Sequence, residues 1–174
     1  MRRILGPVMQ NAFVVDDLEQ AIAHWTQVMR VGPFFRFDHI GFRNLMFRGQ
    51  PAPPIDLTVA IAYWGDLQIE LIRQHDASPS IYREFALARG AGLHHMGVMS
   101  NALDADLAEL ALLGVKPVLQ GSAAGMRFAY VETDHHPGGM IELIDASAGA
   151  RAFFAQMRAA ALEWDGREPV RTPQ

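Results

Sequence analysis

The chain repeats one order of expected secondary structure. Each half has a strand, an amphipathic helix and three further strands, and each ends in the tetrapeptide Ile-Glu-Leu-Ile, at residues 69–72 and 141–144. An offset of 85 residues, from position 10 to position 95, aligns the two halves. It pairs Gln10 with His95, Leu18 with Leu103, and Trp25 with Leu110. An internal repeat of this kind predicts two similar units that associate and bury a shared surface.

Alternating and helical patterns of apolar residues give the expected elements. Strands are expected at residues 8–15, 56–64, 67–73, 93–100, 116–120, 126–133 and 139–145, and extended, aromatic-rich segments at 34–40 and 44–47. Four helices are expected. The first follows Asp17, which forms a capping-box pattern with Gln20, and the second follows the cap Ser78 and Pro79. The third begins at Leu103, and the fourth covers residues 150–163. The residues after Trp164 are expected to form a loose tail.

These elements predict an α+β fold. A four-stranded sheet with one helix covers only one of its faces, so two such units can pair their uncovered faces around a cavity. We therefore expect two paired βαβββ modules that form a curved sheet around a shared metal and substrate cavity, plus a C-terminal helix. The expected segments are a first module at 1–75, a connection with a short helix at 76–92, a second module at 93–146, and the last helix with a tail at 147–174.

The composition excludes several classes of function. The 174 residues include no cysteine, which excludes disulfides, thiolate metal sites and thiol nucleophiles. The formal net charge of -4 gives no reason to expect nucleic acid or an anionic membrane as a partner. No apolar stretch is long enough for a membrane span, and the first residues lack the apolar core of a signal peptide. A cytoplasmic protein is therefore expected.

Side-chain alternation along the expected strands brings polar residues to the uncovered faces. Gln10 and Glu70 share this face in the first module. His95 and Glu142 share it in the second, while His94 is expected to point to the opposite face as a core histidine. One imidazole, two carboxylates and one amide oxygen suit Zn, Ni, Co, Mn or Fe. A divalent ion would also offset the cost of burying two carboxylates.

With these residues the chain resembles the vicinal oxygen chelate superfamily, which includes glyoxalase I, methylmalonyl-CoA epimerase, extradiol dioxygenases and bleomycin-resistance proteins. The stretches that carry the resemblance are residues 10–18, the Val31-Gly32-Pro33-Phe34 turn, residues 92–98 and both Ile-Glu-Leu-Ile strands. Together they span Val8 to Asp145. In that family the metal ligands lie on the first and last strand of each paired module.

The resemblance implies a divalent metal ion, with Zn, Ni, Co or Mn favoured over Fe. Its implied ligands are Gln10, Glu70, His95 and Glu142. Glu142 is the implied catalytic base, with Glu70 as a second base on the opposite side. The implied activity is that of a metal-dependent lyase or isomerase, similar to glyoxalase I or an acyl-CoA epimerase, which transfers a proton next to a polarised carbonyl. The ligand set looks like that of some glyoxalase I enzymes, whereas epimerases more often have histidine first and glutamine second.

Four further residues are candidates for substrate binding, namely Arg43, Arg127, Tyr130 and His136. Arg43 could clasp an anionic group, or could be solvated at a strand edge. Arg127 and Tyr130 lie on one expected strand, and the sequence leaves open which of its faces lines the cavity. His136 lies in a polar loop similar to an epimerase stretch near the substrate. The segments 50–54 and 121–125 are expected to shape the mouth of the cavity.

Several alternatives stay open at the level of sequence. The substrate is a small carbonyl compound, a thiol adduct or an acyl-CoA, and lyase, isomerase and epimerase reactions all fit. A drug-binding resistance protein without catalysis is the second hypothesis. An iron dioxygenase is the third, disfavoured because only one of the four ligand positions is histidine. A homodimer is expected, since paired modules of this superfamily often complete their cavity across a dimer.

Overall fold

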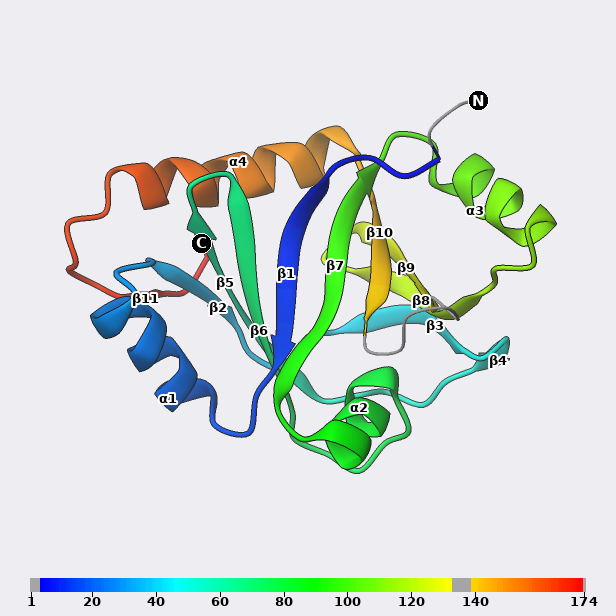
Figure 1. The fold of residues 1–174 in the computed structure, drawn as a ribbon, viewed down its shortest axis with the longest axis horizontal. Coiled ribbons are helices and arrows are strands. Elements are labelled where there is room, and N and C mark those ends of the chain that lie inside the picture. Colours follow the sequence, from blue (N-terminus) through cyan, green and yellow to red (C-terminus); the bar gives the residue numbers. More distant parts are fainter. Residues whose placement is uncertain (1–3, 133–138, 174) are drawn as a thin grey trace.

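One curved sheet dominates the structure (Figure 1), a computed structural model that describes residues 4–132 and 139–173. The strands are β1 (Val8–Val14), β2 (Phe34–Phe37), β3 (Phe42–Phe47), β4 (Gln50–Pro51), β5 (Leu57–Trp64), β6 (Leu67–Gln74), β7 (Gly92–Ser100), β8 (Pro117–Ala123), β9 (Met126–Glu132), β10 (Met140–Asp145) and β11 (Val170–Arg171). The helices are α1 (Leu18–Ala23), its π-helical extension η1 (His24–Val28), α2 (Ile81–Arg89), α3 (Leu103–Leu112) and α4 (Ala148–Leu162). The order across the sheet is β11-β2-β5-β6-β1-β7-β10-β9-β8-β3-β4.

The repeat predicted from the sequence is visible in the strand order. β1 and β7, the first strands of the two units, pair antiparallel at the centre of the sheet. The last strand of each unit then lies parallel to its first, β6 beside β1 and β10 beside β7. The predicted α+β fold with a curved sheet is confirmed. Four strands that are distant in the sequence therefore meet in the middle of the sheet, where the expected ligands lie.

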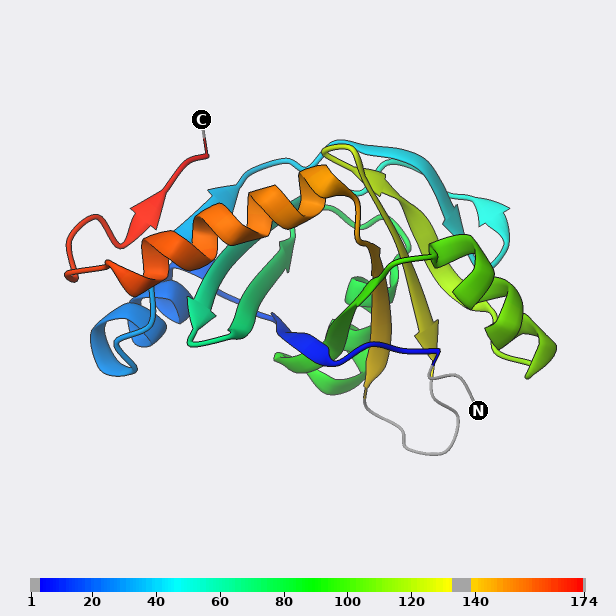
Figure 2. The same ribbon diagram turned by 90° about the horizontal axis from the view of Figure 1, so that it is seen from above.

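Strands β3 and β4 extend the sheet at the far edge of the second unit. β3 pairs with β8, with Phe42 opposite Ala123 and Phe47 opposite Leu119. Figure 2 shows this segment crossing from the first unit to the second, above the open side of the curve. The sequence pattern indicated an extended segment at residues 44–47, but alternation alone does not specify a partner strand. The crossing brings Phe42 to the inside of the curve.

The helices cover the outer face and the two ends of the sheet. Leu18 of α1 lies in one buried cluster with Ile69 and Leu71 of β6, as strand alternation predicted. Leu103 of α3 lies in a matching cluster with Leu143 of β10. Figure 1 shows α4 crossing the upper end of the strands and α2 beneath their lower end. The concave face is thereby enclosed by α4 above, α2 below and the sheet around it.

Two local predictions were wrong. The N-cap of α2 is Ser80, whose hydroxyl accepts the backbone N–H three residues later at 3.0 Å. Ser78 is instead hydrogen-bonded within the preceding turn. The expected loose tail forms β11, which pairs parallel with β2, and the Phe34 N–H donates to the Pro169 carbonyl at 2.9 Å. A two-residue strand is too short to give a periodic signal in the sequence.

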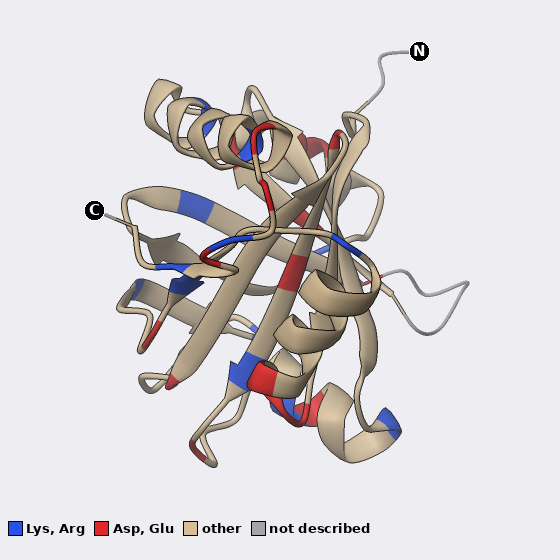
Figure 3. Cartoon of the chain, turned by 90° about the vertical axis from the view of Figure 1, so that its left-hand side faces the viewer, with Lys and Arg blue, Asp and Glu red and all other residues tan. Residues whose placement is uncertain are grey.

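Charged residues of both signs are interspersed on the side of the molecule shown in Figure 3. Several form surface pairs, including Arg36 with Glu19 and Asp38. Among residues 4–132 and 139–173, no helix is both long and apolar enough to cross a membrane.

Candidate metal centre and cavity

Two rows of residues across the central strands build the site. Along β6, β1, β7 and β10 the first row is Gln68, Gln10, Gly97 and Glu142. The second row is Glu70, Ala12, His95 and Met140. Each row contains one small residue, Gly97 in the first and Ala12 in the second. Longer polar side chains from the neighbouring strands can converge above these two positions. The four predicted ligand positions therefore occupy one face of four adjoining strands.

The imidazole of His95 lies between two carboxylates. His95 Nε2 is 3.4 Å from Glu70 Oε2 and 3.4 Å from Glu142 Oε2. One ligand atom from each of these residues lies within 4.8 Å of the other two. Ligand atoms that each lie about 2 Å from one ion are separated by roughly 3 to 4 Å, so the spacing fits a single divalent ion. His95 is fully buried, whereas Glu70 and Glu142 keep 12% and 9% of their side-chain exposure, so only the carboxylates reach the open space.

The charges of this cluster do not balance without a further cation. Burial alone would lower the pKa of His95, but the nearby Glu142 and Glu70 carboxylates raise this pKa to about 9. Burial raises the pKa of Glu70, an effect that His95 opposes and the charge of Glu142 reinforces. One imidazolium facing two buried carboxylates leaves an uncompensated negative charge of the kind that buried sites avoid. A divalent ion that takes the place of the proton on the imidazole nitrogen would balance the two carboxylates.

Gln10 is held with its carbonyl oxygen free. Its Nε2 donates to Gln68 Oε1 at 2.6 Å, and Gln68 Nε2 donates to the Tyr63 hydroxyl at 2.9 Å. Gln10 Oε1 is left buried without a hydrogen-bond partner, and the same is true of Glu70 Oε2 and His95 Nε2. Such orphaned atoms are rare in folded proteins. Three orphaned atoms lie here together, and all three belong to residues that the sequence analysis predicted as metal ligands. They fit a metal ion bound between these side chains.

Gly97 provides the room for the amide. A Cβ at position 97 would lie 2.3 Å from Gln10 Oε1 and 2.9 Å from Gln10 Cβ. Both distances are far below van der Waals contact, so any side chain there would displace the glutamine. Gly97 also lies directly opposite Glu142 on β10. The glycine is therefore part of the site, although the sequence analysis gave it no role.

His94 does not follow the alternation expected from the sequence. The pairing of β1 with β7 shifts register between Ala12 and Phe13, which face His95 and Leu93, so His94 is the extra residue of a β-bulge. A bulge re-aims side chains and breaks the period of two. The prediction that His94 points to the face opposite His95 was therefore wrong. Its Nδ1 lies 2.9 Å from the Nδ1 of His95.

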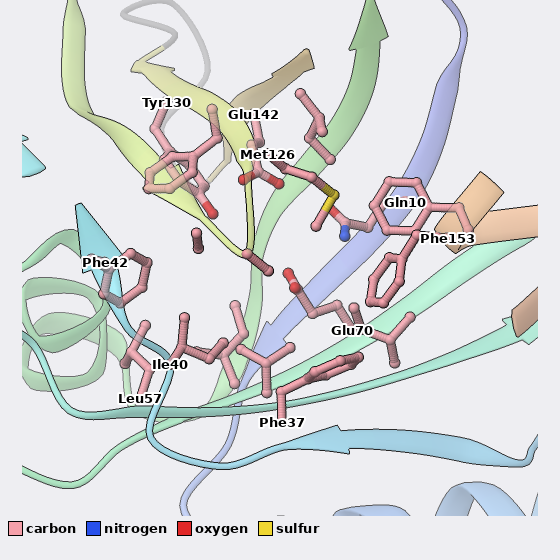
Figure 4. Close-up of a pocket in the computed structure, with 18 of the residues that line it drawn as sticks. Gln10, Phe37, Ile40, Phe42, Leu57, Glu70, Met126, Tyr130, Glu142 and Phe153 are labelled. Carbon is pink, nitrogen blue, oxygen red and sulfur yellow. The ribbon is translucent and has the colours of Figure 1, made fainter. Parts of the chain in front are cut away.

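The ligand cluster lies at one end of a cavity of about 130 Å³ (Figure 4). Figure 4 shows the side chains of Gln10, Glu70 and Glu142 extending into it. The remaining walls are mainly apolar and come from the sheet and α4; they include Phe37, Ile40, Phe42, Met126, Phe128 and Phe153. The site thus combines a polar end with a hydrophobic chamber, the usual form of a small-molecule site.

The candidate substrate-binding residues differ in whether they line the cavity. Tyr130 lines the cavity. Arg127 lies on the outside, where it forms an ion pair with Asp104, and Arg43 is exposed and does not line the cavity. His136 lies outside the described residues. Of the two segments expected at the mouth, 121–125 contributes Ala123 and Ala124 to the lining, whereas 50–54 contributes none of the described lining residues.

Tyr82 of α2 is a site residue that the sequence reasoning missed. Its hydroxyl lies 2.9 Å from that of Tyr130, and both rings are buried in the cavity wall. Burial, together with the charge of Glu142, raises the pKa of both phenols well above the ordinary value. Both hydroxyls therefore stay protonated. The sequence offered no specific signal for this role, because the contact of Tyr82 with Tyr130 joins residues 48 positions apart in the chain.

The sheet of two repeated units, with a polar cluster where their first and last strands meet, defines a protein of the paired βαβββ class. The sequence model of the Glyoxalase/Bleomycin resistance protein/Dioxygenase superfamily matches residues 9–130. The chain belongs to this superfamily.

Solved structures of similar fold include metabolic enzymes. Methylmalonyl-CoA epimerase from Mycobacterium tuberculosis matches with a TM-score of 0.60 and 20% identity, over 87% of this chain and 95% of that one. A methylmalonyl-CoA epimerase in complex with methylmalonyl-CoA and NH4+ matches with a TM-score of 0.58 and 16% identity, over 83% and 96%. A hypothetical protein from Bacillus halodurans C-125 matches with a TM-score of 0.58 and 16% identity, over 81% and 94%. Comparison with proteins of curated function gives no significant match. At these identities the likeness describes the fold alone.

Proposed function

We propose that the protein is a divalent-metal-dependent lyase or isomerase that transfers a proton next to a carbonyl group. The observation that carries the proposal is the set of three orphaned buried atoms, Gln10 Oε1, Glu70 Oε2 and His95 Nε2, beside the Glu142 carboxylate. The donor set of one nitrogen and several oxygens suits Zn, Ni, Co or Mn. An iron dioxygenase is disfavoured, because the usual iron site of that kind has two histidines.

The reaction needs a group that stabilises charge and a group that moves a proton. A bound divalent ion supplies Lewis acidity, which lowers the cost of negative charge on a neighbouring carbonyl oxygen. The Glu142 carboxylate takes the proton from the adjacent carbon and later returns it to the same carbon or to its neighbour. Which carbon receives the proton decides between epimerisation, isomerisation and a glyoxalase-type reaction. Positioned acid–base catalysis of this kind contributes roughly a hundred- to ten-thousandfold.

Glu142 is assigned as the base and Glu70 as a ligand that can also act as a second base. Glu142 lies opposite Tyr130 in the pairing of β10 with β9, and its charge raises the pKa of the Tyr130 phenol more than the charge of Glu70 does. The proton acceptor and the phenolic donors thus lie on the same side of the cavity. Glu70 lies on β6 of the first unit, and Figure 4 shows its side chain apart from Tyr130.

Metal analysis and isotope exchange test the proposal. Protein purified without added metal is expected to contain about one equivalent of Zn, Ni, Co or Mn. In deuterated solvent it should then catalyse exchange of the hydrogen next to a carbonyl in a panel of candidate compounds, followed by NMR. Stoichiometric iron with oxygen uptake would favour the dioxygenase, and absence of metal at any supplied concentration would favour a drug-binding protein. The expected homodimer is part of the same proposal, and sedimentation analysis tests it.

A further inference from the structure

We infer that the cavity binds an uncharged carbonyl compound with a hydrophobic tail about the size of one ring, rather than a substrate part that carries a carboxylate or phosphate. This inference rests on the proposed function for the carbonyl group. The neutral, apolar character of the rest of the ligand follows from the cavity walls independently of any reaction.

The first argument is the absence of positive charge on the cavity wall. Among the described residues that line the cavity, the charged ones are Glu70 and Glu142, and none is arginine or lysine. Two arginines elsewhere on the fold are held by other partners, Arg127 by Asp104 and Arg48 by Glu84. An anionic ligand group in the cavity would lose its hydration without gaining a counter-ion from the described lining residues, which opposes binding.

The charge balance of the cluster leads to the same result with or without a metal ion. With a divalent ion, its two charges are matched by Glu70 and Glu142. Without a bound ion, Glu70 and Glu142 are the charged side chains among the described residues that line the cavity. Neither state leaves positive charge for an anionic substrate. When Glu142 takes a proton from a neutral substrate, it loses its own charge as the substrate gains one, so the total charge in the cavity stays constant.

The second argument is the kind of hydrogen bond that the cavity offers. Tyr82 and Tyr130 form a hydroxyl pair at 2.9 Å. Each hydroxyl carries one hydrogen, and a single hydrogen bond between them uses only one of the two. The other hydrogen can be donated to a ligand, since both tyrosines line the cavity. A neutral donor beside a carboxylate is suited to the oxygen of a ketone or hydroxyl group.

The third argument is size and orientation. The cavity measures about 130 Å³. An apolar cavity of roughly 150 Å³ is known to hold benzene, so the enclosed space fits about one ring. Figure 4 shows Phe37 and Phe153 facing the space on the side away from Tyr130. A ligand would therefore place its oxygen atoms at Glu142 and Tyr130 and its apolar tail toward Phe37 and Phe153.

Direct binding of two matched probes tests this inference. 2-Hydroxyacetophenone is neutral, and its 4-carboxy derivative differs only by a charged group on the ring. Calorimetry with the full chain, both metal-free and loaded with Zn, measures the two affinities. The neutral probe is expected to bind at least about tenfold more tightly, because an unpaired buried charge opposes binding. Equal or tighter binding of the carboxylate would overturn the inference, as would failure of both probes to bind at millimolar concentration.

Variants that add a cation to the wall sharpen the test. Met126→Lys places an ammonium in the cavity, and Ala124→Lys places one at an exposed lining position where the fold tolerates a long side chain. Either should raise the affinity for the carboxylate probe about tenfold and lower that for the neutral probe. Met126→Gln is the matched uncharged control and should leave the order of the two probes unchanged. A lysine variant that folds and does not alter the ratio of affinities would contradict the charge argument.

This experiment separates the inference from the proposed function. Binding preference is measured without turnover and without metal. If the protein binds no divalent ion and exchanges no deuterium, yet prefers the neutral probe, the proposed function fails and the inference on ligand class stands. If it binds metal and exchanges deuterium in carboxylate-bearing compounds, the proposed function stands and the inference fails.

Discussion

His94 Nδ1 lies 2.9 Å from His95 Nδ1, inside a β-bulge in which His95 pairs with Ala12 and His94 is the extra residue. His94 Nε2 lies 3.4 Å from the Ile81 carbonyl, which can only accept, so His94 carries its proton on Nε2. Burial, with the charge of His95, lowers the pKa of His94 to about 3 and keeps it neutral. His94 Nδ1 therefore accepts a hydrogen bond, which the Nδ1–H group of His95 donates. This hydrogen bond fixes the ring of His95 and leaves its Nε2 toward the carboxylates.

Replacement of His94 should weaken metal binding although the residue is not a ligand. His94→Leu removes the acceptor that orients His95, and loss of such supporting hydrogen bonds typically lowers metal affinity about 10- to 100-fold. His94→Asn keeps an oxygen close to the position of Nδ1 and should restore most of the affinity. Competitive titration with a metal indicator measures both variants. If His94→Leu and His94→Asn bound metal equally well, the hydrogen bond to His95 would have no orienting role.

The polar residues of the site were predictable because strand alternation is local. Glu70 and Glu142 lie in strands with regular pairing, and the sequence places each of them on its correct face. His94 could not be placed, since its bulge results from pairing with β1, a strand more than 80 residues away in the chain. Alternation is a property of one strand, whereas a bulge is a property of two.

The remaining differences also come from long-range contacts. The β3 segment was expected to be extended, but its partner β8 lies in the other unit. Tyr82 was assigned to a connecting helix, and its role depends on Tyr130, 48 residues later. β11 is ordered by its pairing with β2 rather than by any preference of its own two residues. Sequence patterns therefore predicted most of the elements and the strand faces of the candidate ligands, while the walls of the cavity depended on tertiary pairing.

A methyl group at position 97 should displace the Gln10 amide and weaken metal binding. Gly97→Ala brings a Cβ within 2.3 Å of Gln10 Oε1, so the amide must move or the strands must separate. Overpacking of this kind costs about 1–3 kcal/mol in stability, and the displaced amide should also lower metal affinity. Gly41→Ala is the matched control, since a Cβ at position 41 meets nothing within 4 Å. Unfolding by urea and metal titration give the two readouts. Unchanged metal affinity in a folded Gly97→Ala variant would show that Gln10 is not a ligand.

Removal of the metal should lower the thermal stability of the protein. A ligand present at one hundred times its dissociation constant stabilises the folded state by about 2.7 kcal/mol. For a chain of this length each kcal/mol shifts Tm by roughly 2–4 °C, so a chelator should lower Tm by about 5–10 °C. Scanning calorimetry with and without chelator measures the shift. His95→Gln, which lacks the imidazole ligand, should show little response to the chelator. An identical Tm for the native chain in both conditions would argue against a bound ion.

Glu142→Gln should abolish proton transfer while the fold is retained. The amide keeps the shape of the side chain and an oxygen that can contact a metal ion, but it cannot accept the proton. The rate of deuterium exchange next to the substrate carbonyl should fall about a hundred- to ten-thousandfold, with circular dichroism unchanged. Glu132→Gln is the matched control, because Glu132 lies on β9 with 43% of its side chain exposed and outside the cavity lining. Near-normal exchange by Glu142→Gln would move the catalytic base to Glu70, whose own glutamine variant would then have to lose the activity.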